Sequence, residues 1–212
     1  MRKMNKKTVA LTLLSLASVF ALSTTVVNAE ETTPTVDATE TTTTTGSDVT
    51  INPGSLSVTK VSESLEFGAL TIKGDGSGQI AKSTNDLNLT VADLRGTREG
   101  WHVTAKHDGV KNSTVGKEDT LEKTTITLNN GDLSNNVDAT NAPTLSSANT
   151  IIGTDSVLIS NSTEGNGMGS WAHSWKTGNV DLNIPAKEAR DMYKGQYSTT
   201  ITWKLVAGPQ AE

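Results

Sequence analysis

The chain has 212 residues, a net charge of −5, no cysteine and only 4% aromatic residues. The lack of cysteine excludes disulfide bonds, thiol catalysis and thiolate metal sites. The negative charge disfavours nucleic acid and anionic lipid headgroups as partners.

The first 29 residues have the pattern of a secretory signal peptide. Four basic residues lie within the first seven, and an almost uncharged apolar stretch follows over 8–27. Small residues end this stretch, so we expect cleavage after Ala29 and export. The alternative is an uncleaved membrane anchor, because the stretch approaches the length that spans a bilayer. Cleavage would remove four of the 18 basic residues and none of the 23 acidic ones, which leaves a net charge of −9 and no membrane span.

Residues 30–49 are rich in Thr and Glu and have almost no apolar side chains, which predicts a disordered segment. This segment is either a spacer or glycosylated stalk, or a plain linker. Residues 50–212 then read as one domain of ordinary size.

The domain is predicted to be all-β, because apolar residues alternate in short runs separated by turn-forming residues. Strands are expected at 56–58, 65–67, 87–91, 101–105, 124–128, 157–159, 180–184 and 196–206. One short helix is expected at 186–193, and long surface loops at 74–78, 133–150 and 161–170. This pattern is typical of a β-sandwich or a barrel-like domain of short antiparallel strands.

Large side chains follow one face of the last predicted strand. With period-two alternation, Tyr197, Trp203 and Leu205 share a face, and Lys204 points the other way. Trp101 and Val103 form a similar row on an earlier strand.

The two rows form parts of a recognisable signature. Tyr197 is followed after five residues by Trp203-Lys204-Leu205, and Asp93-Leu94-Arg95-Gly96 leads into Gly100-Trp101-His102-Val103. With the segments 65–68 and 180–185, these motifs resemble the WxL domain family over nearly the whole mature chain. The sequence departs from the pattern at Val103, where the family name expects Leu.

The resemblance implies a secreted surface protein of a low-GC Gram-positive bacterium, attached non-covalently to peptidoglycan in the cell wall. It implies the small, single-domain form of the family, with Trp101, Val103, Tyr197, Trp203 and Leu205 as the cell-wall-binding motif. It also implies a second function, assembly with a membrane- or wall-anchored WxL-interacting partner protein. Both functions stay open at this point, and neither involves a cofactor.

The tryptophans allow two interpretations. The motif tryptophans either stack on wall sugars or fill the core, and Ile201 and Leu205 beside Trp203 favour the core. Trp171 and Trp175 follow a Gly-rich run, so we predict that they form an exposed contact loop; the alternative is that one of them caps the barrel end.

The residues give little support for an enzyme or a metal site. His102, His107 and His173 lack metal-ligand spacing, and neither a nucleophile elbow nor a phosphate-binding loop is present. Asp93 beside Arg95 is expected to form a turn or an ion pair. We therefore predict a non-enzymatic protein without metal or cofactor.

Overall fold

The computed structural model describes residues 49–114, 119–135 and 140–210. The predicted signal peptide (1–29) lies outside the described residues, as does the predicted linker (30–49) apart from its last residue. Within the described ranges, no helix has the length and hydropathy needed to cross a bilayer.

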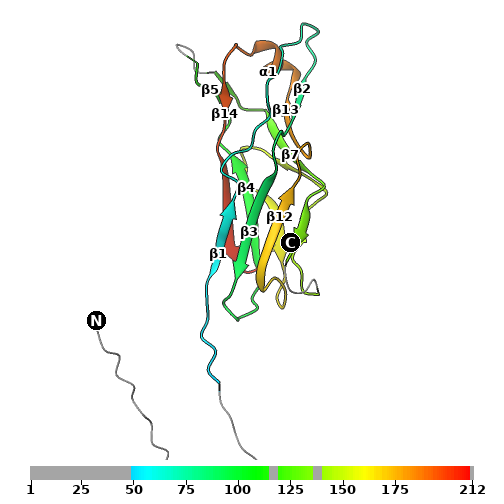
Figure 1. Cartoon of the computed structure of the whole chain (residues 1–212). Helices are drawn as coiled ribbons and strands as arrows, with labels where there is room; N and C mark the ends of the chain where they lie inside the picture. The colour runs from blue at the N-terminus through cyan, green and yellow to red at the C-terminus, as the bar shows by residue number, and fades with distance from the viewer. Residues whose placement is uncertain (1–48, 115–118, 136–139, 211–212) are drawn as a thin grey trace, which may run out of the picture. The chain divides into compact units, whose positions relative to one another are not determined.

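Two four-stranded antiparallel sheets pack on either side of the main core (Figure 1). The first has the order β1-β3-β12-β8, with bounds Leu56–Val61, Leu87–Asp93, Gly169–Trp175 and Asp132–Ser134. The second has the order β15-β4-β11-β9, with bounds Ile201–Ala207, Trp101–His107, Val157–Ser162 and Thr144–Leu145. The predicted all-β, sandwich-like class is confirmed.

Two smaller sheets and a helix lie at the other end of the domain, at the top of Figure 1. One sheet has the order β10-β7-β13-β2, with bounds Asn149–Ile152, Thr125–Asn129, Val180–Ile184 and Gln79–Lys82. The other has the order β14-β5-β6, with bounds Tyr197–Ser198, Val110–Asn112 and Asp119–Leu121. Helix α1 spans Ala186–Asp191 directly after Pro185, whose ring favours the first turn of a helix.

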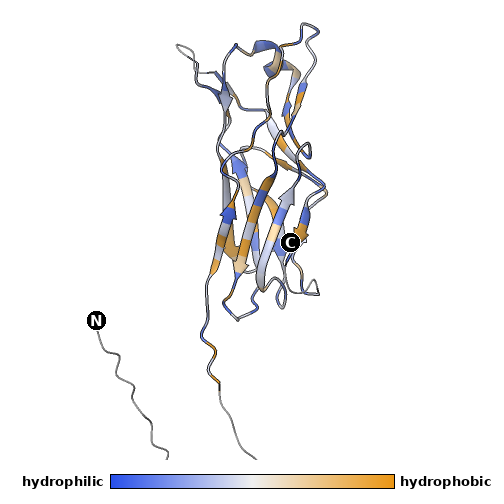
Figure 2. Ribbon diagram, in the orientation of Figure 1, coloured by the Kyte–Doolittle hydropathy of each residue, from blue (hydrophilic) through white to orange (hydrophobic). Residues whose placement is uncertain are grey.

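The main core is built by alternation. Along β3, β4 and β12 every second side chain is buried, and these side chains pack together in the main core. Hydrophobic and hydrophilic residues accordingly follow one another along these strands in Figure 2. The largest of them are Leu87, Leu89, Val91, Trp101, Val103, Trp171 and Trp175. Ile159 of β11 and residues of the β10-β7-β13-β2 sheet (Ile126, Leu128, Ile152 and Val180) complete this core. A second, smaller core contains Val110, Leu121, Ile184 and Ala189, between the end sheets and α1.

Several predicted boundaries are wrong. The predicted strand at 65–67 forms no ladder, and the predicted loops at 133–150 and 161–170 contain all or part of β8, β9, β10, β11 and β12. β8, β9 and β10 are short and carry Ser, Thr and Asn, so their sequences resemble loops, and glycines and serines surround the start of β12. Tertiary pairing overrides such weak local preference.

The connection between β3 and β4 is held by a buried carboxylate. Both oxygens of Asp93 accept hydrogen bonds from the Arg95 guanidinium, at 2.9 and 2.8 Å. This guanidinium keeps the pKa of Asp93 below its usual value and also donates to the Gly100 carbonyl at 2.8 Å. The expected ion pair is confirmed, and it fixes the chain just before Trp101.

Gly100 and Gly96 offer a matched test of this connection. Both have a φ of 75°, but a Cβ at Gly100 would overlap the backbone of Ser162 and Thr163, whereas at Gly96 it would meet nothing within 4 Å. We expect Gly96→Ala to cost about 1 kcal/mol of unfolding free energy and Gly100→Ala about 3 kcal/mol. Urea unfolding of both variants measures this; equal losses would show that Gly100 is needed only for its backbone angle.

Candidate functional site

The first motif lies inside the sandwich. Trp101 and Val103 in β4 are both fully buried. The indole N–H of Trp101 donates to the Gly167 carbonyl at 2.9 Å, so its one polar atom is satisfied by the protein. These two side chains are placed to support the fold, and neither reaches the surface.

Trp171 and Trp175 are buried as well, so the prediction that they form an exposed contact loop is wrong. Each is only 2% exposed. Both belong to β12, which pairs with β3 on one side and β8 on the other. Strand alternation therefore points both rings into the core, and the Trp171 N–H donates to the Met168 carbonyl at 3.0 Å.

An aromatic row connects the tryptophans of the two motifs. Trp101 contacts His173, His173 stacks on Trp175, and Trp175 stacks on Trp203, with ring centroids 6.2, 6.3 and 6.2 Å apart. Such ring pairs add to the stabilisation that comes from burial alone. The row runs from the buried first motif to the last strand of the chain.

His173 is the buried polar member of this row. Its Nε2 lies 2.9 Å from the Ser160 hydroxyl, and its Nδ1 lies 3.2 Å from the Leu89 carbonyl. Burial disfavours the charged imidazolium and lowers the pKa of His173 to about 4. The ring is therefore neutral at pH 7 and acts as part of the core.

The final segment is not the single strand predicted at 196–206. β14 ends at Ser198 and β15 begins at Ile201. At the break, an Asp108 carboxylate oxygen accepts from the backbone N–H of Thr200 at 2.8 Å and from the Thr199 hydroxyl at 3.1 Å. These bonds keep the pKa of Asp108 well below its usual range.

The break separates Tyr197 from the rest of its motif. Tyr197 pairs with Asn112 of β5 and packs against the second core, while Trp203 and Leu205 pack against the main core. The Tyr197 hydroxyl donates to Asp119 at 2.9 Å. The predicted common face of Tyr197, Trp203 and Leu205 is therefore wrong.

Trp203 differs from the other three tryptophans because it is only half-buried. It lies on β15, an edge strand of its sheet, opposite Ala105 of β4. Its ring plane is within 25° of that of Trp175. Thr202 and Lys204 beside it are exposed, as alternation predicts.

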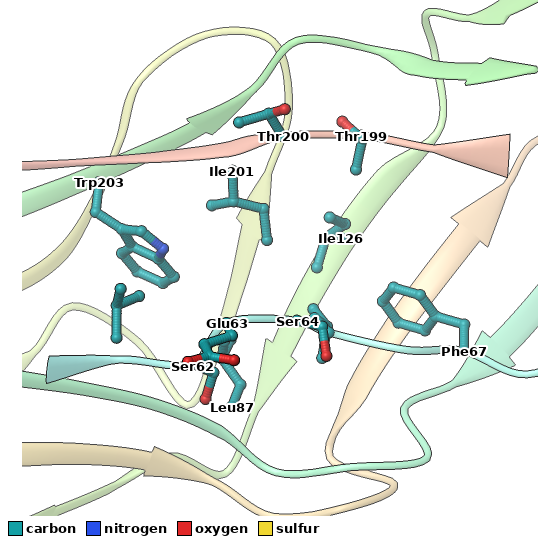
Figure 3. Close-up of a pocket in the computed structure, with 12 residues that line it drawn as sticks. Ser62, Glu63, Ser64, Phe67, Leu87, Ile126, Thr199, Thr200, Ile201 and Trp203 are labelled. Carbon is teal, nitrogen blue, oxygen red and sulfur yellow. The ribbon is translucent and has the colours of Figure 1, made fainter. Parts of the chain in front are cut away.

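A groove opens beside Trp203, between β15 and the segment that follows β1 (Figure 3). Its volume is about 410 Å³. Its lining residues are Val61, Ser62, Glu63, Ser64, Leu65, Phe67, Leu87, Ile126, Thr199, Thr200, Ile201 and Trp203, and this set is called the Trp203 groove below. The lining combines aromatic and aliphatic side chains with the hydroxyls of Ser and Thr residues and one carboxylate.

The wall of the groove opposite Trp203 is held by one amide side chain. The Asn85 carbonyl oxygen accepts from the Glu66 backbone N–H at 2.9 Å, and its NH₂ donates to the Ser64 carbonyl at 3.0 Å. Glu66 also accepts a backbone bond from Thr84 at 2.7 Å. Segment 62–67 therefore has a defined path although it belongs to no sheet.

Sequence reasoning missed the Trp203 groove as a site. The sequence predicts a strand at 65–67 and places 65–68 in the family signature, whereas Glu63 and Ser64 belong to no motif. Neither signal indicates a groove. The bonds of Asn85 could not have been read from spacing alone.

The histidines provide no metal centre. Among the residues the structure describes, no group of three or more His, Asp or Glu side chains is placed to hold a metal ion. His107 is buried, which lowers its pKa, and the ring of His102 bonds the Gly208 carbonyl at 2.8 Å.

Comparison with known families gives one match. A family model described as WxL domain, surface cell wall-binding, matches residues 19–209. No curated protein matches, and no solved structure matches.

Proposed function

This chain belongs to the WxL family of surface cell-wall-binding domains, and from that membership we propose that it is exported and held on the wall by non-covalent binding to peptidoglycan. Membership supports a wall-associated role at the cell surface and a binding domain in place of an enzyme. The further step to peptidoglycan as the ligand, and to export through cleavage after Ala29, is our proposal.

The extent of the match is the observation that carries this proposal. It covers both motifs and the strands between them, so the whole folded domain corresponds to the family. The net charge of the mature chain also bears on which component of the wall is bound. A mature chain with a net charge of −9 is repelled by the phosphate polymers of a Gram-positive wall, which leaves the less charged peptidoglycan as the favoured component.

Pelleting with isolated walls tests the proposal. The chain lacking only its predicted signal peptide is mixed with sacculi stripped of protein, and in parallel with sacculi also stripped of phosphate polymers. We expect it to sediment with both, and at least as strongly with the second, because removal of like charge favours binding. Failure to sediment with either preparation would contradict peptidoglycan binding.

Assembly with an anchored partner protein is the second candidate. Its support is a pair of neighbouring edge strands: β1 and β15 are both terminal in their sheets as far as the described residues go, and they lie next to each other (Figure 1). Free edges accept an extended segment from another chain through main-chain hydrogen bonds. Binding to bare sacculi only when a WxL-interacting partner protein is added would favour this candidate over the first.

A further inference from the structure

We propose that the Trp203 groove is the glycan-binding site, in which the indole of Trp203 lies against a sugar ring of the peptidoglycan strand. This inference rests on the proposed function and adds the location and the chemistry of the contact. In it, Trp203 has two roles: it ends the aromatic row in the core and lines the groove at the surface.

The first argument is the type of surface in the groove. Sugar rings present apolar C–H faces surrounded by hydroxyls, and they fit aromatic floors with polar rims. Trp203 and Ile201 project from β15 on one side, and Phe67 lies across from them on the segment that follows β1 (Figure 3). Leu65 also lines the groove, and the lining residues Ser64 and Thr200 are exposed. A volume of about 410 Å³ lies in the range of small-ligand sites and is large enough for a short saccharide.

The second argument is that two polar groups at the groove have no partner in the described part of the chain. The indole N–H of Trp203 has no acceptor within hydrogen-bond distance there, whereas those of Trp101 and Trp171 have one; the N–H of Trp175, away from the groove, also has none there. The exposed Glu63 carboxylate forms no ion pair or hydrogen bond with the described residues. An N-acetylated sugar supplies a carbonyl to accept from the indole and hydroxyl or amide hydrogens to donate to the carboxylate.

The third argument concerns charge. Glu63 is the only charged side chain among the residues that line the groove. A carboxylate without a neighbouring cation repels phosphates and carboxylates, so the groove selects against the anionic polymers of the wall. An uncharged, N-acetylated glycan meets this condition.

The fourth argument concerns access and rigidity. β15 and β1 are edge strands, and neither pairs with a further strand among the residues that the structure describes. Asn85 holds the opposite wall through two hydrogen bonds to segment 62–67. A rigid, open groove favours a polymer that enters from the side, because little ordering is needed on binding.

Blocking the groove tests this inference. Ser64 is an exposed rim residue, and Ser64→Trp fills the space opposite Trp203; Ser170→Trp adds the same bulk at an exposed position of β12 outside the groove. Binding to stripped sacculi and to oligomers of N-acetylglucosamine is measured by sedimentation and calorimetry. We expect Ser64→Trp to weaken both by about tenfold or more and Ser170→Trp to leave both unchanged.

A conservative pair refines the test. Glu63→Gln keeps the size of the side chain but removes its charge, and Glu164→Gln is the matched change at an exposed residue outside the groove. We expect Glu63→Gln to weaken oligomer binding about threefold and to increase binding to walls that retain phosphate polymers. We expect Glu164→Gln to change neither.

The outcomes separate the two proposals. Wild-type binding to sacculi that Ser64→Trp leaves intact would overturn the glycan groove and preserve the proposed function. Loss of partner-protein binding in Ser64→Trp, with sacculus binding intact, would assign the groove to a peptide and also overturn the glycan site. If the wild-type chain does not bind bare sacculi, both the proposed function and the glycan-binding groove are overturned.

Discussion

Replacing Trp101 with alanine is expected to lower the free energy of unfolding by about 3–5 kcal/mol, the range measured for buried aromatic side chains. Trp101 is fully buried, contacts His173 in the aromatic row, and donates its one N–H to the Gly167 carbonyl. Because domains of this size are stable by only about 5–15 kcal/mol, this loss is a large share of the total stability and should lower the melting temperature markedly. Urea unfolding followed by circular dichroism measures the loss.

Two controls accompany this experiment. Ile80→Ala shortens an apolar side chain that is 61% exposed and should change the stability by less than about 0.5 kcal/mol. Trp203→Ala removes a half-buried ring and should cost less than Trp101→Ala. A folded Trp101→Ala variant of nearly native stability would refute the structural role of the first motif.

Acidification is expected to destabilise the domain by about 3 kcal/mol between pH 6.5 and pH 4 through His173 alone. The pKa of His173 is about 4 in the folded chain, against 6.5 for an unperturbed imidazole. In this window the unfolded chain binds a proton that the folded chain does not, so stability falls as pH falls. Burial lowers the pKa of His107 too, which adds to the loss in the same direction.

His173→Gln separates this effect from general acid unfolding. The amide retains hydrogen-bonding groups toward Ser160 and Leu89 but does not titrate. The unfolding free energy of His173→Gln should therefore vary less with pH between 6.5 and 4 than that of the wild type. The double variant His173→Gln/His107→Gln should show a still smaller dependence on pH. Carboxylates such as Asp93, whose pKa is lowered, lose their contribution mainly below pH 4. An unchanged slope in His173→Gln would contradict a buried neutral imidazole.

The strands most visible in the sequence are those with strict alternation. Residues 87–91 and 101–105 were expected as strands and form the first five residues of β3 and β4. Their alternation reflects one face in the core and one face outside it, a property that depends on local sequence alone. The all-β class follows from several such runs.

The sequence did not predict β12 as a strand. Ala172, His173 and Ser174 separate its two tryptophans, and glycines precede it, so local propensity suggested a loop. Its strand character comes from pairing with β3, whose partner residues lie 76 to 88 positions earlier in the sequence. An imidazole is buried there because Ser160 and Leu89 satisfy its nitrogens, and this arrangement exists only in the folded chain.

The break in the last strand has a similar origin. Thr199 and Thr200 continue a perfect alternation, yet Asp108, about ninety residues earlier, binds both and ends β14. The same kind of long-range bond, from Asn85 to segment 62–67, builds the wall of the Trp203 groove. The motif residues were therefore recognisable from sequence, whereas the groove beside them was not.

Fluorine NMR of the fluorotryptophan-labelled chain tests most directly that the motif tryptophans build the core and that Trp203 alone faces a ligand. The chain has four tryptophans and should give four resonances; the one that is lost in Trp203→Phe belongs to Trp203. We expect only the Trp203 resonance to broaden with a soluble paramagnetic agent and to shift when N-acetylglucosamine oligomers are added, because Trp101, Trp171 and Trp175 are buried. A Trp203 resonance that responds to neither, or a Trp101 resonance that responds to both, would contradict this account.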